Sequence, residues 1–306
     1  MEENYSRTKP FFSIIIPCWN NEDTLERTLH SIFEQSYTNY EIILVVRDKK
    51  PNFDYSFDVT HVLEQTDCGV SNARNLGLKY AKGTHVCFLD ADDTWSCTHL
   101  ETLDKILWKY PHLDWVIHNF YWVTKKNCRI KNPSIVASIY NYFDLFGVFN
   151  KCFHVLSSTC FRNVWREDYS AHPIYFNPNM PLGEDIEFIT KFALRYPLCY
   201  YDSRPTVNYN APEKPSKKYT RDEVNIPALD DLLEQSDSAA LNYLDVWSLS
   251  TCLQNLDRGH NTRAYFCLDF VSDKYKLKRR VLRMLCLMPY PIGLWTHILY
   301  NKFIWK

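Results

Sequence analysis

The sequence HVCFLDADD, residues 85–93, places three carboxylates directly after a short apolar segment that is typical of a buried strand. In open parallel sheets, ligands bind beyond the carboxyl ends of the strands. Asp90, Asp92 and Asp93 have no Lys or Arg beside them, so they repel one another, and a hard divalent cation would relieve that repulsion. The same residues also fit a solvated turn in which Asp93 caps the following helix.

Toward the N-terminus, short apolar segments alternate with segments of helical period. Strands are expected at 11–17, 41–46 and 59–64, and helices at 22–35 and 71–81. Asn20 or Asn21 is expected to cap the first of these helices, and Ser71 the second. Short buried strands that alternate with helices predict a parallel α/β sheet.

Beyond residue 94 the pattern becomes mixed. A helix is expected around 100–107, strands at 115–123 and 155–161, and a further helix at 184–194. The segment NAPEKPSKK, residues 210–218, is rich in Pro and Lys and is predicted to be a linker. Helical patterns follow at 227–234, 238–256 and 262–275, ahead of a basic tail.

Composition excludes several classes of protein. The formal charge is −1, with 35 Lys plus Arg and 36 Asp plus Glu, which argues against a uniformly basic nucleic-acid binder. The seven glycines form neither the G-x-G-x-x-G pattern of a dinucleotide site nor a P-loop. No run of eighteen apolar residues occurs, so no transmembrane helix is expected.

The 11 cysteines bear on the compartment. Their number is odd, no C-x-x-C occurs, and residues 1–10 are polar and charged, unlike a signal peptide. We therefore expect reduced, mostly buried thiols in a cytosolic protein.

The tail differs in charge from the rest of the chain. Residues 274–306 contain eight Lys or Arg and no acidic residue, so the first 273 residues carry −1 − 8 = −9. Basic residues interleaved with Leu, Met, Trp and Phe predict an amphipathic segment on an anionic membrane. A helical lid with a solvated basic face is the alternative.

Four motifs occur in a fixed order along the chain. Beside D-A-D-D these are CWNNE (18–22) after the first strand, GVSNARN (69–75) and GEDIEF (183–188). The set resembles the family 2 glycosyltransferases of GT-A fold, whose patterns are P-x-Y-N-x-E, G-x-S-x-A-R-N, D-x-D-D and G-E-D-x-x-F. The resemblance covers roughly residues 11–210. It implies a Rossmann-like, mostly parallel α/β sheet in a catalytic domain over 1–212, with a donor-nucleotide half (11–92) and an acceptor half (93–212). Residues 213–306 would form a helical C-terminal extension.

The resemblance also implies a function and roles for residues. The chain would be a metal-dependent inverting glycosyltransferase that uses a nucleoside-diphosphate sugar, foremost a UDP-sugar. Asp92 would bind Mn²⁺ or Mg²⁺, Asp185 would be the general base, and Asp93 and Glu184 would support them. The matched donor-binding positions are Pro17, Trp19, Glu22, Arg74 and Asp90. Arg74 could alternatively form an ion pair on a helix face.

The chain also departs from the family pattern. Val46 and Arg47 occupy the positions of an Asp pair that reads the base, and Asp48 substitutes only with a shift of one residue. Trp19 replaces the usual Tyr, and Asn210 stands where many relatives have Arg. A non-catalytic sugar-binding protein of the same fold therefore stays open, and a nucleotidyltransferase is a further alternative. As an enzyme, the chain would act on a glycan or lipid-linked acceptor at the inner face of a bacterial membrane, without nucleic acid.

Overall fold

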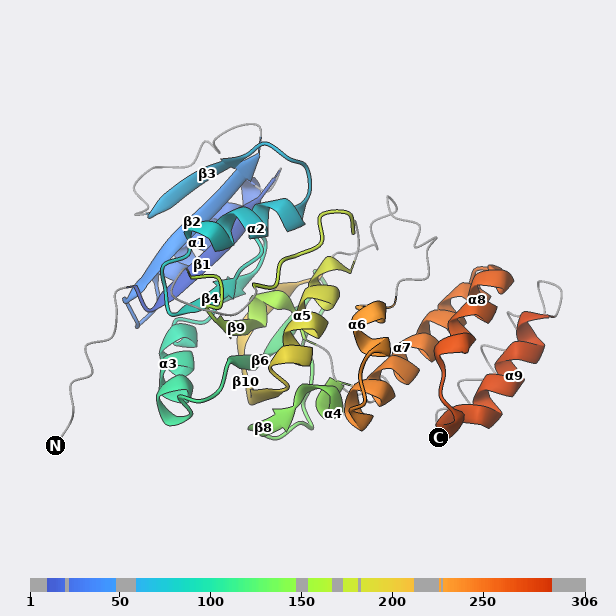
Figure 1. Ribbon diagram of the computed structural model, residues 1–306. Helices are drawn as coiled ribbons and strands as arrows, with labels where there is room; N and C mark the ends of the chain where they lie inside the picture. Colours follow the sequence, from blue (N-terminus) through green and yellow to red (C-terminus); the bar gives the residue numbers. More distant parts are fainter. Residues whose placement is uncertain are drawn as a thin grey trace. The chain divides into compact units, whose positions relative to one another are not determined.

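The computed structural model describes residues 10–19, 22–47, 59–146, 154–166, 173–180, 183–211, 226 and 228–287 (Figure 1). The chain divides into two compact units, one of Met1–Tyr142 and Lys151–Lys217, the other of Phe143–Asn150 and Lys218–Lys306. The subdivision of the first unit into donor and acceptor halves stays a prediction. Residues 212–218 of the expected linker and 288–306 of the tail lie outside the described residues.

The first unit is built on a mixed sheet with strand order β3-β2-β1-β4-β9-β6-β10-β5. Four strands run parallel: β3 (His61–Gln65), β2 (Tyr40–Arg47), β1 (Phe12–Cys18) and β4 (His85–Phe88). The other half combines β9 (Thr159–Arg162), β6 (Trp115–Val123), β10 (Leu198–Asn210) and β5 (Thr94–Trp95), with β7 (Cys128–Ile130) and β8 (Ser138–Asn141) beside it. In that half only β6 and β10 are parallel. The predicted α/β class is confirmed.

Helices cover both faces of the parallel strands, and the alternation of side chains along β1 explains how. Ile14 and Ile16 share a core with Leu25 of α1 (Glu22–Phe33) and with residues of α3 (His99–Lys109). Ile15 faces α2 (Val70–Tyr80), where a Cβ on Gly77 would lie 2.4 Å from the Ile15 Cγ2. A glycine is therefore needed where α2 crosses β1.

Some expected elements begin or end elsewhere. Residues 155–161 do not form one strand: Leu156–Ser158 is a 3₁₀ turn, and β9 starts only at Thr159. The prediction that Ser71 caps α2 is wrong, because Gly69 is the N-cap, with φ 102°, and no side chain bonds there. Asn20 and Asn21 lie outside the described residues. α5 (Glu184–Arg195) forms as expected, within one residue.

The second unit is helical, which confirms the predicted helical extension. It contains α6 (Leu229–Leu233), α7 (Ser238–Asp257), α8 (Asn261–Cys267) and α9 (Lys276–Cys286), while α4 (Tyr142–Phe146) spans the sequence boundary between the units. The helix expected over 262–275 forms only in its first part, because α8 ends at Cys267. The chain leaves α8 for two 3₁₀ turns, and between them the Asp245 carboxylate of α7 accepts hydrogen bonds from the Ser272 amide (2.5 Å) and hydroxyl (2.7 Å).

Two further findings concern the described ranges only. None of their helices combines the length and the apolar character that a membrane crossing requires. Ten cysteines fall in these ranges; all ten are free thiols, and seven of them are buried.

Candidate active site

The loop after β4 is held by backbone contacts from two directions. The Thr28 hydroxyl of α1 lies 3.0 Å from the Ala91 carbonyl and 2.8 Å from the Asp93 carbonyl. The Asp92 carbonyl accepts hydrogen bonds from Arg27 (2.9 Å) and from the Asn210 side chain at the end of β10 (2.6 Å). Three backbone carbonyls of the loop are thereby held in place.

The three aspartates of this loop have different surroundings. Asp93 is fully buried, and its carboxylate accepts hydrogen bonds from the Ser157 hydroxyl (2.6 Å) and the Asn210 amide (2.9 Å). Burial and the charge of Asp90 raise the pKa of Asp93 well above its usual range. Asp90 and Asp92 are only partly buried. The structure therefore places Asp93 in the scaffold, and it does not cap α3, whose N-cap is Thr98.

Arg74 connects the loop to the GEDIEF motif. Its guanidinium, 5% exposed, donates to Asp90 Oδ1 (2.9 Å) and to Glu184 Oε1 (3.0 Å) and lies over the Phe176 ring at 5.3 Å. Burial opposes its charge, but Asp90, Glu184 and Asp185 outweigh burial and raise the pKa of Arg74. Arg74 is therefore a buried bridge and not an ion pair on an exposed helix face.

Glu184 and Asp185 open α5 but differ in their contacts. Glu184 binds Arg74; burial and the neighbouring Asp185 raise the pKa of Glu184, and Arg74 opposes that rise. Asp185 Oδ1 accepts a hydrogen bond from the Ile186 amide (2.8 Å), at the positive end of the helix dipole. The second carboxylate oxygen of Asp185 makes no hydrogen bond that the described residues show.

The pKa of Tyr209, near the end of β10, is affected by carboxylates from both acidic motifs. Burial raises the pKa of Tyr209 to about 12, and the charges of Asp93, Asp90, Asp92 and Asp185 add to the rise. Burial and the charge of Asp90 also raise the pKa of Asp92. The structure thus brings together carboxylates from the D-A-D-D and G-E-D motifs.

The residues present fit a divalent cation that takes part of its ligands from a substrate. In the described part of the chain, no three His, Cys, Asp or Glu side chains converge to hold a metal ion alone. Mg²⁺ commonly binds through one or two protein carboxylates and completes its shell with phosphates and water. Asp92, crowded by Asp90, offers the hard oxygen ligand that such a site requires.

The remaining donor-binding positions lie at the ends of β1 and β2. Pro17 is half-buried, and Trp19 is 53% exposed with the Arg47 guanidinium 5.0 Å from the ring centroid. Arg47, which departs from the family pattern, thus forms a cation–π contact with the residue that replaces Tyr. Asp48 and the side chain of Glu22 lie outside the described residues.

Sequence reasoning missed three residues of the site. Ser157 bridges the loop, because it donates to Asp93 and accepts from the Asp90 amide (3.2 Å). Phe176 supports Arg74, and Asn210 binds the loop at two points. Only Asn210 had a signal, as a departure from the family; Ser157 and Phe176 match no motif.

Comparisons with known proteins show which family the chain resembles. Residues 13–161, just under half of the chain, match the family described as "Glycosyl transferase family 2". The amylovoran biosynthesis glycosyltransferase AmsB of Erwinia amylovora is 37% identical over 95 residues, which are 28% of this chain and 31% of AmsB.

A second relative carries a more specific name. WfgD of Escherichia coli, a UDP-Glc:alpha-D-GlcNAc-diphosphoundecaprenol beta-1,3-glucosyltransferase, is 35% identical over 100 residues, 29% of this chain and 38% of WfgD. The chain thus spans less than half the length of these relatives.

A solved structure shows the same fold. S. aureus TarS residues 1–349, in complex with UDP-GlcNAc, superimposes with a TM-score of 0.65 at 18% identity. The match covers 90% of this chain and 88% of that one.

Proposed function

We propose that the chain transfers a sugar from a nucleoside-diphosphate sugar to a hydroxyl of a glycan or lipid-linked acceptor. The premise is that residues 13–161 place the chain in glycosyl transferase family 2. The observation that carries the proposal is the convergence of Asp90, Arg74 and the Glu184–Asp185 pair beyond the ends of the parallel strands. These residues come from three motifs that are separated by up to 110 positions.

Asp185 is proposed as the general base of a single displacement. Its carboxylate takes the proton of the acceptor hydroxyl while that oxygen bonds to the anomeric carbon of the donor sugar. The bond from that carbon to the diphosphate oxygen breaks, the nucleoside diphosphate leaves, and the anomeric configuration inverts. Arg74 keeps Glu184 away from the base role, because it holds the Glu184 carboxylate in an ion pair.

The negative charge of the diphosphate requires a cation to neutralise it, and Asp92 is the proposed protein ligand of that cation. A bound Mn²⁺ or Mg²⁺ would neutralise the charge that develops on the leaving diphosphate. Asp90, oriented by Arg74, is proposed to contact the donor. Asp93 and Ser157 support both residues through the loop scaffold.

A UDP-sugar is the proposed donor. The name of WfgD includes UDP-Glc, and the TarS neighbour was solved with UDP-GlcNAc. Pro17 and Trp19, with Glu22 and Asp48, are proposed to line the nucleotide site at the ends of β1 and β2. Arg47 over Trp19 adds a cation to that site, so the base is not held by carboxylates alone.

The acceptor and the location follow from the relatives and from α9. AmsB is named for the biosynthesis of amylovoran, and WfgD for a sugar linked to diphosphoundecaprenol. α9 carries five Lys or Arg, and Leu277, Val281 and Met284 are exposed along one side of it. We therefore propose peripheral binding to an anionic membrane at its cytoplasmic face, with synthesis of a surface polysaccharide as the role.

The test uses the full chain with UDP-Glc, UDP-GlcNAc and GDP-mannose. We expect a UDP-sugar to raise the melting temperature only with Mn²⁺ or Mg²⁺, because ligands that bind the native state stabilise it. Asp92→Asn should abolish the metal-dependent shift, whereas Glu101→Gln, which removes an exposed carboxylate paired with Lys105, should retain it. Equal shifts with EDTA would overturn the metal role. Donor binding without turnover on any acceptor would favour the non-catalytic alternative.

A further inference from the structure

The hairpin formed by β6 and β7 carries a cluster of positive charge that the proposed mechanism does not use. Lys125 and Lys126 lie in its turn, and Arg129 and Lys131 follow. Residues 115–143 contain no Asp or Glu. Arg129 is exposed, and it makes no ion pair with a described residue. The hairpin therefore presents cations without acidic neighbours in the sequence.

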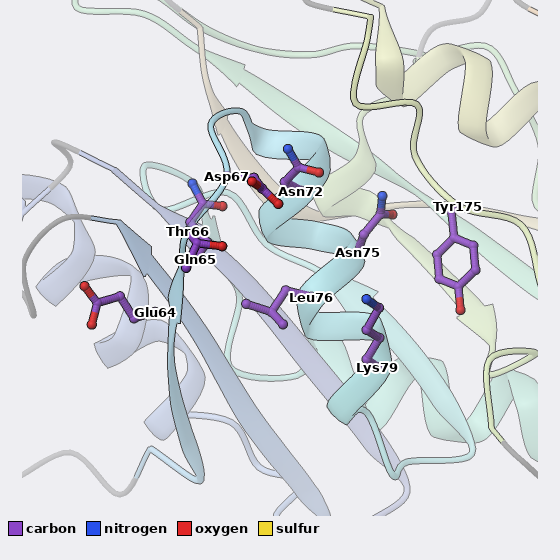
Figure 2. Close-up of a pocket in the computed structure, with 9 residues that line it drawn as sticks. All are labelled: Glu64, Gln65, Thr66, Asp67, Asn72, Asn75, Leu76, Lys79 and Tyr175. Carbon is purple, nitrogen blue, oxygen red and sulfur yellow. The ribbon is translucent and has the colours of Figure 1, made fainter.

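This charge distinguishes the hairpin from the pocket of about 500 Å³ between β3 and α2 (Figure 2). The pocket has two carboxylates, Glu64 and Asp67, beside one ammonium, Lys79. These charges give the pocket no preference for an anion. The hairpin has basic groups only, so charge complementarity selects an anionic partner for it.

The register of three strands connects Arg129 to the proposed active site. Tyr209 of β10 pairs with Trp122 of β6, and Trp122 pairs with Arg129 of β7. Paired residues on neighbouring strands place their side chains on the same face of a sheet. The Tyr209 and Trp122 rings are in contact, with centroids 5.1 Å apart, and the Lys131 ammonium lies 4.7 Å from the Trp122 centroid. Two aromatic rings and two cations thus form one row.

Tyr209 is the end of this row that lies close to the proposed base. β4 and β6 are both antiparallel to β9, and β6 is parallel to β10, so the carboxyl ends of β4, β6 and β10 lie at one edge of the sheet. Besides burial, the charges of Asp92 and Asp185 contribute to the raised pKa of Tyr209. An acceptor whose hydroxyl is held at Asp185 can therefore extend along Tyr209 and Trp122 to the two cations.

The two cations at the other end of the row affect each other. Burial and the charge of Arg129 lower the pKa of Lys131. An anion bound between them would relieve this repulsion. A guanidinium binds phosphate oxygens through two parallel hydrogen bonds, and an ammonium adds a point charge, so a phosphate group fits the pair.

We propose that Arg129 and Lys131 bind the diphosphate that joins an acceptor sugar to its lipid, with Trp122 and Tyr209 beside that sugar. This inference rests on the proposed function, since it specifies the acceptor of the transfer. The donor diphosphate is a separate ligand, because it is proposed to bind the cation at Asp92. The hairpin therefore contributes to acceptor choice and leaves donor binding unchanged.

The experiment measures binding of geranyl diphosphate, a soluble prenyl diphosphate, to the full chain by isothermal titration calorimetry. The titration is performed without nucleotide and again with excess UDP and Mg²⁺. Geranyl diphosphate should bind in both cases. The double variant Arg129→Gln/Lys131→Gln should weaken binding about tenfold or more, because charge-assisted hydrogen bonds to the diphosphate are lost. The exchange Arg129→Lys/Lys131→Arg keeps both charges and should retain most of the binding.

Two control variants test whether the position of the charge matters. Lys125→Gln/Lys126→Gln removes the same charge from the turn of the same hairpin, away from the row, and should weaken binding only about twofold, the scale of a screened surface charge. Lys79→Gln, in the pocket of Figure 2, should have no effect.

The outcomes separate this inference from the proposed function. If geranyl diphosphate does not bind, or if the two hairpin double variants to Gln behave alike, the assignment is wrong. If UDP with Mg²⁺ displaces the probe, the probe occupies the donor site and the assignment is again wrong. If Arg129→Gln/Lys131→Gln loses binding to phosphatidylserine vesicles but keeps that of geranyl diphosphate, the hairpin is a membrane contact instead. Failure of the proposed function would appear differently, as no stabilisation by any UDP-sugar while geranyl diphosphate still binds.

Discussion

At the scale of single residues, the Arg74 guanidinium connects the D-A-D-D and GEDIEF motifs, because it binds Asp90 and Glu184. It is buried, and it lies between two carboxylates that follow it in the sequence by 16 and 110 positions. Removing one partner of a buried ion pair leaves an uncompensated charge, which costs more than the pair itself contributes. The carboxylates of Asp90 and Glu184 would then repel each other without a counter-charge.

Arg74→Met should lower the free energy of unfolding by about 3–5 kcal/mol, the usual cost of breaking a buried pair. Arg74→Lys keeps the charge but loses the fork that reaches both carboxylates, so it should still lose donor affinity. Urea unfolding and donor titration measure the two effects. Lys105→Met, which breaks the exposed pair with Glu101, is the control and should change stability little. Unchanged stability of Arg74→Met would contradict the bridging role.

Asp185→Asn should lower kcat by about 10²-fold or more, because the amide cannot accept the acceptor proton. Its oxygen can still accept the hydrogen bond from the Ile186 amide, so the start of α5 and the donor KM should stay nearly unchanged. Steady-state kinetics with the UDP-sugar separates these quantities. An equal loss in donor binding would make Asp185 a donor-site residue, and a product with retained configuration would exclude the single displacement.

At the scale of elements, β6, β10 and α3 enclose a buried histidine pair. His118 Nδ1 lies 3.4 Å from Asp202 Oδ2, and Asp202 also binds Arg204 (2.7 Å). The rings of His118 and His99 lie 4.9 Å apart. Burial lowers the pKa of His118 to about 4, although the negative charge of Asp202 opposes this change. Burial also lowers the pKa of His99, and the positive charge of a protonated His118 lowers it further. Both rings are therefore neutral in the folded protein at neutral pH.

His118 should keep its neutral ring down to about pH 4 in the folded chain. Its folded pKa lies below its unfolded value of about 6.5, so the unfolded state binds the proton first as pH falls. Its contribution to stability is complete above about pH 6.5 and decreases by on the order of 3 kcal/mol toward pH 4. An NMR titration of ¹³C-labelled histidines measures this. His30, whose side chain is 58% exposed, is the internal control. A His118 midpoint near that of His30 would contradict the prediction.

At the scale of the whole molecule, charge is divided unevenly along the sequence. The excess of basic residues begins at Lys274, and α9 carries most of it within the described chain. On α9, Leu282 and Cys286 pack into the helical core, whereas Leu277 and Met284 are 77% and 63% exposed. Arg279 and Arg283 pair with Asp273 and Asp269. Lys276 and Arg280 make no such pair with a described residue, which leaves them available for an anionic surface.

The full chain should sediment with phosphatidylserine-containing vesicles, less with neutral ones, and be partly released by high salt. Each basic residue near the leaflet contributes about 1 kcal/mol, and salt screens that attraction. The double variant Leu277→Glu/Met284→Glu should weaken binding strongly, and Lys276→Glu/Arg280→Glu should remove the preference for anionic lipid. Leu241→Glu, at an exposed leucine of α7, is the matched control. If the chain does not sediment with anionic vesicles, the membrane proposal is wrong and the alternative, a structural lid, is favoured for α9.

Several strands, helices and site residues could be predicted from the sequence alone. The short continuous apolar segments FFSIIIP and EIILVV were enough to predict β1 and β2, and the helical period of 184–194 predicted α5 within one residue. These patterns are local, because each involves only residues that are neighbours in the sequence. The order of the four motifs, as a resemblance to a family, also predicts that Asp90, Asp92 and Asp185 belong to one site.

The sequence by itself determined the α/β class, the likeness to glycosyl transferase family 2 and the presence of carboxylates at a strand end. Only the tertiary structure decided that Asp93 turns inward to Ser157 and Asn210, and that Arg74 binds Glu184. The physical reason is that the pattern of apolar residues predicts which positions of a helix or strand are buried. It does not predict which side chains from other elements contact them. Contacts such as Arg74–Glu184 join residues 110 positions apart, and only the packing of α2 against the start of α5 makes them.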